Sequence, residues 1–434
     1  MFQKEQTGKK NSARVVVGYD LGSTFSQISF CYIGENEPET ISAVAGTEQY
    51  NIPAVLCKRK GVGQWYYGKE ALKFAQEETG ILVENLLELA QNGEDVLVEN
   101  ETFDPVALLT LYVKRSLSLL NLQISPGQVE AFMLTVEELT PRMVAILEKV
   151  VAGLQLKTQH ICFQSHMESF YYYVLHQEQE LRKSNVVIFE YNDYLKSLRL
   201  ECNHKTQPKV VFIQMEEFPE IKRIDWAEDE GQRESQKLLL DEEFGLVVEK
   251  SLKDEAVSTI YLLGDGFKEG WSKSSLRILC RNRRVFQGNN LYSKGACYGM
   301  LERIAPTEEA KNFVYLGEDK LKSNIGMKVL RRGTDSYFAV MDAGKNWYEA
   351  TADFEIILES GNMIDFIVTP LTGGQVTSRP ILLEGLPERP KKATRLRIHM
   401  EMSAVDQAAV TIEDLGFGEI FLSSGKAWTQ TFLV

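Results

Sequence analysis

The stretch Val15–Phe30, VVVGYDLGSTFSQISF, decides how the first part of this chain folds. Its two apolar runs are separated by an acidic residue, a glycine and two hydroxyl residues: Asp20, Gly22, Ser23 and Thr24. This pattern predicts two β-strands joined by a turn. The turn could also hold a phosphate, with backbone N–H groups at 22–24 facing the anion and Asp20 holding hydrated Mg²⁺ through water. The stretch alone leaves both hypotheses open.

Length, composition and charge limit the class of protein. A chain of 434 residues is too long for one hydrophobic core, so two or three domains are expected. Apolar residues make up 44% and charged residues 25%, as in soluble globular proteins. The net charge of -13 argues against nucleic-acid and anionic-membrane partners, since both require a concentrated basic surface. Proteins, peptides and small ligands stay open as partners.

The cysteines and histidines are scattered along the chain. The six cysteines form no Cys-x-x-Cys pair, which predicts buried free thiols in a reducing compartment. His160 and His166 are close in sequence but have no third partner, so a zinc site is not expected. Residues 1–13 are polar, which predicts a loose tail rather than a secretory signal. No apolar segment approaches membrane-spanning length, and we expect a cytoplasmic protein.

Hydrophobic periodicity predicts an α/β region followed by an all-β region. Helices are expected over 68–78, 103–120, 140–153, 166–181, 228–250 and 293–301. Buried strands are expected from residue 15 and over 27–33, 131–136, 186–189, 198–202, 210–215 and 260–263. Gly153 is the expected stop of its helix, and the small residues of 293–301 imply close packing. No internal repeat is visible, and from about residue 328 short alternating strands predict a β-sandwich-like domain.

A series of motifs, taken in order, resembles a known family. VGYDLGSTFS is similar to its first phosphate motif, and AGTEQYNIPAVLC and YYGKEA are similar to the steps that follow. The segment from AFMLTVEELTP to FQSHMESFYYYVL resembles the family's strand, a helix ending in Ala-Gly-Leu and a Glu-Pro-Thr-Ala-Ala-Ala helix start. IYLLGDGF and NNLYSKGACYGM resemble the adenosine motif and the last helix. The family is that of the seventy-kilodalton heat-shock (DnaK-type) chaperones, in the actin-like ATPase superfamily.

The resemblance implies a two-lobed α/β actin-like ATPase fold with ribonuclease H-like repeats, followed by an all-β sandwich. ILLEGLPERPKKATRLRIHMEMSAVDQAAVTIEDLGFGEI is similar to the family's peptide-binding domain. The implied domains, in chain order, are a tail, lobe I, lobe II with a reduced small subdomain, a linker and the sandwich: 1–13, 14–186, 187–306, 307–327 and 328–434.

The resemblance also implies a site for ATP or ADP with Mg²⁺. Asp20 would contact the Mg²⁺ through water, and Glu168, matched to the motif glutamate, would orient the attacking water. The residues implied to bind nucleotide are Asp20, Gly22, Ser23, Thr24, Gly264, Asp265, Gly266 and Phe267.

The sequence departs from the family most at its second phosphate loop. Where the family has Asp-Leu-Gly-Gly-Gly-Thr, residues 190–195 are Glu-Tyr-Asn-Asp-Tyr-Leu, without the glycines that let N–H groups wrap a phosphate. The family's catalytic lysine has only Lys69 and Lys73 as candidates, out of register. The segment between Glu190 and Gly264 is short for the family, and the helical lid has no counterpart after the sandwich.

Three hypotheses follow. The favoured one is a chaperone-like protein with impaired or absent ATPase activity that binds protein or peptide through its sandwich, with or without bound nucleotide. The second is an active ATP-dependent chaperone that uses Asp20 and Glu168. The third, a small-molecule kinase, would need a catalytic base in the cleft, for which only Asp193 is available. Since fold analogy does not decide function, the 190–195 loop discriminates between them.

Overall fold

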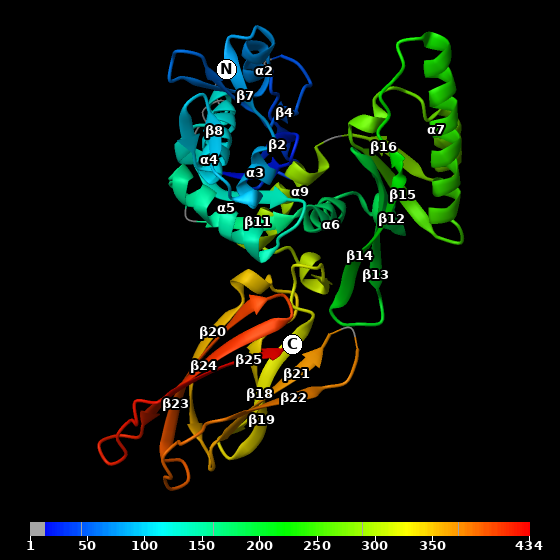
Figure 1. The fold of residues 1–434 in the computed structure, drawn as a ribbon. Coiled ribbons are helices and arrows are strands. Elements are labelled where there is room, and N and C mark those ends of the chain that lie inside the picture. Colours follow the sequence, from blue (N-terminus) through cyan, green and yellow to red (C-terminus); the bar gives the residue numbers. More distant parts are fainter. Residues whose placement is uncertain (1–13, 45, 159, 289, 372) are drawn as a thin grey trace, which may run out of the picture. The chain divides into compact units, whose positions relative to one another are not determined.

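The computed structural model describes residues 14–434 apart from 45, 159, 289 and 372. The predicted tail 1–13 lies outside the described residues. The chain divides into two compact units, one ending at Phe313 and the other comprising Val314–Val434 (Figure 1). Unit 1 combines β-sheets with the helices that cover them, whereas unit 2 is built almost entirely from β-strands.

The first sheet of unit 1 grows from the quoted stretch. Its strand order is β11-β10-β1-β2-β3, and β4 also pairs with β2. β1 is antiparallel to β2 and parallel to β10, which is parallel to β11. The bounds are β1 Val15–Leu21, β2 Phe25–Tyr32, β3 Glu39–Thr40, β4 Ile52–Pro53, β10 Val129–Val136 and β11 His160–Ser165. The predicted hairpin at 15–30 is therefore confirmed.

The second sheet repeats this topology. Five of its six strands lie in the order β16-β15-β12-β13-β14, with β12 antiparallel to β13 and parallel to β15, and β15 parallel to β16. The bounds are β12 Asn185–Tyr191, β13 Tyr194–Asn203, β14 Lys209–Lys222, β15 Val257–Leu263 and β16 Arg284–Gln287. Each half thus has three antiparallel strands, then helix, strand, helix, strand and helix. This structural repeat is not visible in the sequence.

The helices of the two halves correspond in order. The first half contributes α4 Pro105–Leu117, α5 Pro141–Leu154 and α6 His166–Leu175; the second contributes α7 Glu230–Ser251, α8 Lys273–Leu279 and α9 Leu291–Ile304. Insertions in the first half add β5 Leu56–Arg59, β6 Trp65–Tyr67, α2 Gly68–Gln76, β7 Gly80–Val83, α3 Leu86–Asn92, β8 Val96–Val98 and β9 Glu101–Phe103. Short 3₁₀ turns are η1 Ser118–Leu122, η2 Pro126–Gln128, η3 Gln179–Arg182, η4 Asp265–Phe267 and η5 Ala310–Asn312.

The last helix of each half lies between the two sheets (Figure 1). α6 packs on the second sheet, where Phe170 and Val174 join a core with Ile188 and Tyr261. α9 packs on the first sheet through a core of small and sulfur-containing residues: Val16, Cys31, Ala131, Met133, Ala296, Cys297 and Met300. Each half therefore covers the sheet of the other half, and α6 and α9 contact each other at the centre of the unit.

Glycine makes this central contact possible. A Cβ at Gly295 of α9 would lie 2.0 Å from the carbonyl oxygen of Ser169 in α6. A Cβ at Gly18 of β1 would lie 2.2 Å from the carbonyl oxygen of Ser293. The predicted close packing of 293–301 is confirmed, because no larger side chain fits where backbone meets backbone.

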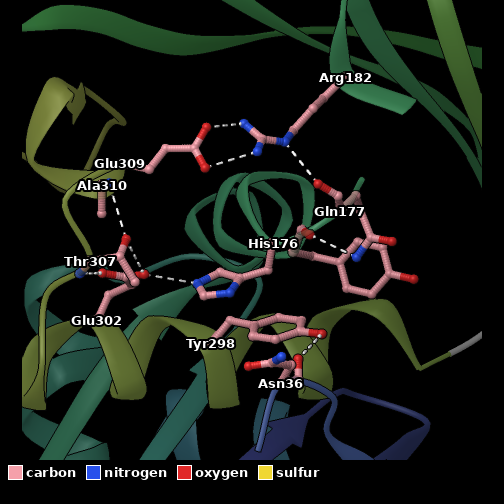
Figure 2. A network of polar contacts seen from close by, with 10 residues as sticks. Asn36, His176, Gln177, Arg182, Tyr298, Glu302, Thr307, Glu309 and Ala310 are labelled. Carbon is pink, nitrogen blue, oxygen red and sulfur yellow. Dashed lines mark hydrogen bonds and ion pairs between the residues drawn. The ribbon is translucent and has the colours of Figure 1, made fainter. Parts of the chain in front are cut away.

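The segment that leaves α9 is held to the end of α6 by polar contacts (Figure 2). The Glu302 carboxylate accepts hydrogen bonds from the backbone N–H of Thr307 at 2.7 Å and from its hydroxyl at 2.9 Å, and lies 3.0 Å from His176 Nε2. The His176 ring stacks on Tyr298 at 4.2 Å. Farther along this segment, the Arg182 guanidinium donates two parallel hydrogen bonds, of 2.7 and 2.9 Å, to the Glu309 carboxylate.

Three sequence predictions are corrected. Gln155, in the left-handed conformation at φ 52°, ends α5 instead of Gly153, whose missing Cβ makes room for Thr110 of α4. The helix expected over 166–181 ends at Leu175 and is followed by η3. The expected linker 307–327 contains β17, Phe313–Tyr315, and the first residues of β18, and the boundary between the units falls at Phe313.

Unit 2 consists of two four-stranded antiparallel sheets, with orders β19-β18-β21-β22 and β20-β23-β24-β25. The strands are β18 Ser323–Arg331, β19 Thr334–Met341, β20 Thr351–Leu358, β21 Met363–Pro370, β22 Thr377–Leu382, β23 Thr394–Ala404, β24 Gln407–Gly416 and β25 Ala427–Leu433, with η6 at Trp347–Glu349. The predicted alternation in 396–402 is confirmed, since Leu396, Ile398, Met400 and Met402 are all buried.

A buried ion pair anchors the loops at one end of unit 2. Arg389 makes two parallel bonds of 2.7 Å to Asp414, and the two side chains are 4% and 0% exposed. Asp414 also accepts bonds from the backbone N–H groups of Gly416 and Ser424. The Arg389 guanidinium, helped by these bonds, holds the pKa of Asp414 well below its usual range.

Gly295→Ala should destabilise unit 1 by about 1–3 kcal/mol or more, because the added methyl group overlaps backbone that cannot move without separating α6 from α9. Urea unfolding followed by circular dichroism measures the change. Gly63→Ala is the matched control, since a Cβ there meets nothing within 4 Å. Equal stability of the two variants would contradict the close-packing argument.

Arg389→Met should destabilise unit 2 by about 3–5 kcal/mol, because it leaves the Asp414 carboxylate buried without its cation. Since the folded-state pKa of Asp414 is lowered, its stabilisation is complete above the unfolded value of about 3.8 and is lost as pH falls below that value. The wild type should therefore lose more stability than Arg389→Met between pH 5 and 3. Asp353→Asn, at the exposed Asp353–His399 pair, should change stability by less than about 1 kcal/mol.

Candidate functional site

A cleft of about 330 Å³ in unit 1 brings together turns from the two sheets. Its walls are the β1–β2 turn at 20–25, the β12–β13 turn at 190–194 and residues 263–265 after β15. Because the two sheets share one topology, these turns occupy equivalent positions in the repeat. The predicted residues that line the cleft are Asp20, Gly22, Ser23, Thr24, Gly264 and Asp265.

Three predicted site residues do not line this cleft. Phe267 is buried in an aromatic core with Tyr191, Phe244 and Trp271. Gly266 packs directly against the Tyr191 ring, because a Cβ at Gly266 would lie only 2.4 Å from a ring carbon. These residues support the fold of the second sheet and do not face a ligand in the cleft.

Glu168 is the third, and its predicted role is not supported. It is the third residue of α6 and is 1% exposed. The helix cap is Ser165, whose hydroxyl accepts the N–H of Glu168, and His166 is the first helical residue. In the motif that this segment resembles, the proline would occupy the first helical position, which is His166 here, so the resemblance then aligns the motif glutamate with Ser165.

His166 lines the cleft, although the sequence indicated no role for it beyond a zinc site that was not expected. Its Nε2 lies 2.7 Å from Asp20 Oδ1, and its ring stacks on Tyr292 with centroids 4.1 Å apart. The Tyr292 hydroxyl donates to Glu190 at 3.1 Å, and Asn192 donates to the other Glu190 oxygen. The only signal in the sequence was the position of His166 directly after a strand, where a helix starts.

These contacts set the charges in the cleft. Burial opposes protonation of His166, but the Asp20 carboxylate outweighs it and raises the pKa of the imidazole. Burial raises the pKa of Glu190. Burial also opposes the charge of Lys196, yet its bond to Glu137 raises the pKa of the ammonium. The Asp20 carboxylate is therefore already engaged by the His166 imidazole, and the Lys196 ammonium by Glu137.

The β1–β2 turn is organised as a hairpin. The Gly22 N–H donates to the carbonyl oxygen of Phe25 at 3.1 Å, so it is not available to a phosphate. The carbonyl oxygen of Thr24 accepts from the N–H of Ala54, which ties the turn to the segment after β4. The Ser23 and Thr24 side chains are exposed at the cleft.

The β12–β13 turn is equally fixed. A Cβ at Gly264, which has φ 96°, would lie 2.4 Å from the Tyr191 carbonyl oxygen, so the two loops meet backbone to backbone. The Tyr191 hydroxyl donates to the carbonyl oxygen of Lys222 at 2.6 Å. Asn192, Asp193 and Tyr194 line the cleft where the resembling family has glycines.

A triphosphate fits this cleft poorly. Its acidic lining residues are Asp20, Glu137, Glu190, Asp193 and Asp265, against Lys196, Arg223 and His166. Lys196 is engaged by Glu137 at 2.7 Å and Glu217 at 3.6 Å. Lys69 and Lys73 do not line it, and among the described residues no three His, Cys, Asp or Glu side chains are grouped as metal ligands. An anionic ligand would meet net negative charge.

Unit 2 carries a second, larger hollow. A groove of about 1100 Å³ runs between β19 and β20, which are edge strands of the two sheets. The exposed apolar residues that line it are Leu330, Tyr337, Phe338, Ile357, Met363 and Phe417. Its ion pairs, Lys392–Glu359 and Arg395–Glu355, neutralise much of the rim charge. An apolar groove flanked by strand edges suits an extended polypeptide.

Two family profiles match the chain. The one described as "Family of unknown function (DUF5716) C-terminal" matches residues 37–318, and "Domain of unknown function (DUF8552)" matches residues 320–434. Because the first match covers more than half of the sequence, this chain belongs to the DUF5716 family. No curated protein matches the chain at a significant level. No helix in the described part is both long and apolar enough to cross a membrane.

Proposed function

We propose that this protein is a divergent relative of the DnaK-type chaperones whose nucleotide cleft has lost most or all ATPase activity. It acts as a chaperone-like protein that binds protein or extended peptide through its C-terminal β-sandwich. The fold part of the proposal, an actin-like ATPase domain, is supported by five strands in each of the two sheets that correspond in order and direction. The helix between consecutive parallel strands in each half supports it too.

The observation that carries the loss of catalysis is the Asp20–His166 pair. A carboxylate 2.7 Å from a buried imidazole is already engaged by that side chain, so it is poorly suited to organise hydrated Mg²⁺. Glu168 lies outside the cleft, and Asn192 and Asp193 stand where phosphate would need backbone N–H groups. Phosphoryl transfer depends almost wholly on positioning and electrostatics, so these changes should cost several powers of ten in rate.

An active ATP-dependent chaperone is the second candidate. One observation favours it: the β1–β2 turn, the β12–β13 turn and Gly264 line the same cleft, as a bound nucleotide would require. The kinase hypothesis has less support, because Asp193 lies in a tight turn between two strands. The free cysteines, three of them buried, support the proposal that the protein works in the reducing cytoplasm.

The purified full chain should release no phosphate from ATP with Mg²⁺ above a protein-free control. Its melting temperature should also be unchanged by millimolar ATP, because a ligand that does not bind the folded state cannot stabilise it. Differential scanning fluorimetry and a phosphate-release assay measure the two effects. The double variant Asn192→Gly, Asp193→Gly tests whether these two side chains are what keeps phosphate out. Their removal should make any phosphate binding stronger.

Asp20→Ala decides between the two candidates. If the wild type releases phosphate and Asp20→Ala does not, the protein is an ATPase and the proposal is wrong. If an ATP-induced rise in melting temperature disappears in Asp20→Ala while phosphate release stays at background, nucleotide binding survives without catalysis. Glu168→Gln serves as the control for a buried carboxylate outside the cleft.

The groove of unit 2 should bind short apolar peptides in extended form, and an unfolded protein should compete with them. Phe338→Ser should weaken binding at least about tenfold, because the ring is 39% exposed in the groove and packs 5.2 Å from Phe354. Ile420→Ser is the matched control: its side chain is 85% exposed but lies outside the groove. Fluorescence anisotropy measures both, and no binding at high peptide concentration would refute peptide recognition.

A further inference from the structure

Two sets of contacts cross the cleft and join the sheets of unit 1. We name their members the cleft latch: Asp20, Glu137, His166, Glu190, Lys196 and Tyr292. Asp20 lies in β1 and Glu137 directly follows β10, both of the first sheet, whereas Glu190 and Lys196 belong to β12 and β13 of the second. All six line the cleft.

The direct crossing is an ion pair. Lys196 Nζ lies 2.7 Å from Glu137 Oε1, and these residues come from different sheets. The Lys196 side chain is only 19% exposed, and its ammonium also lies 5.0 Å from the Tyr194 ring centroid. A lysine held on several sides has lost its rotamer freedom already, so the pair forms at little further entropic cost.

The second crossing passes through the starts of α6 and α9. Asp20 contacts His166, the His166 ring lies parallel to Tyr292 at an angle of 5°, and Tyr292 donates to Glu190. His166 and Tyr292 begin the two helices whose close contact fills the space between the sheets. The chain of contacts therefore rests on a rigid base, and it runs from the first sheet to the second without a gap.

We propose that the cleft latch holds the two sheets of unit 1 together across the cleft without any bound ligand. In a two-lobed nucleotide-binding protein, a ligand in such a cleft would contact both sides; here the chain's own side chains do so. Access to the cleft then requires these contacts to break. The inference does not depend on the proposed function, since it concerns only contacts within this chain.

Hydrogen–deuterium exchange on the full chain tests the latch, with no nucleotide added. Lys196→Met removes the charge but keeps the length of the side chain. It should raise amide exchange on both sides of the cleft, in 190–196 on one side and in 20–25 and 133–137 on the other. The expected increase is about two- to fivefold, which is what the loss of a partly exposed ion pair can produce. High salt should produce the same pattern in the wild type more weakly.

Lys250→Met is the matched control, because Lys250 pairs with Glu216 at 2.5 Å within the second half and does not cross the cleft. Its effect should stay near 214–218 and 246–252. If Lys196→Met fails to fold, Glu137→Gln, on the opposite side and 70% exposed, should give the same two-sided pattern. An increase confined to the mutated side, in both latch variants, would overturn the proposal.

Discussion

The contact between α6 and α9 is the constraint on which the rest of unit 1 depends. Gly295 allows the backbone of α9 to touch the Ser169 carbonyl, and Gly18 allows β1 to approach the same helix. With the two helices this close, each can cover the sheet of the other half. The contact also fixes the helix starts, so His166 and Tyr292 stack and meet Asp20 and Glu190 at the cleft.

The cleft combines converging loops from two sheets with side chains that already pair with one another. Three loops converge as a phosphate site would need, yet the groups that face each other are paired acids and bases. Each pair removes a donor or acceptor that a ligand would use, and each also stabilises the folded state.

The chain carries two different kinds of candidate surface. The cleft of unit 1 is polar, small and internally satisfied, whereas the groove of unit 2 is larger, mostly apolar and open at the strand edges β19 and β20. Apolar surface left exposed on a soluble domain usually marks a site of interaction. The matches to DUF5716 and DUF8552 divide the chain at about residue 319, close to the boundary between these two units.

Local sequence determined much of this structure. The hairpin at 15–30, the caps Asp104 and Thr140, and the alternation in 396–402 follow from short-range rules, because neighbouring residues decide turns, caps and burial on one face. What only tertiary structure decided lies between distant segments: the packing of α6 and α9 each on the sheet of the other half, and the pairing of Asp20 with His166, 146 positions away. Glu168 was assigned to the cleft because motif matching does not resolve a shift of two residues, which is the separation in sequence between Glu168 and the cleft residue His166. Those contacts depend on packing in three dimensions, which no periodicity along the chain records.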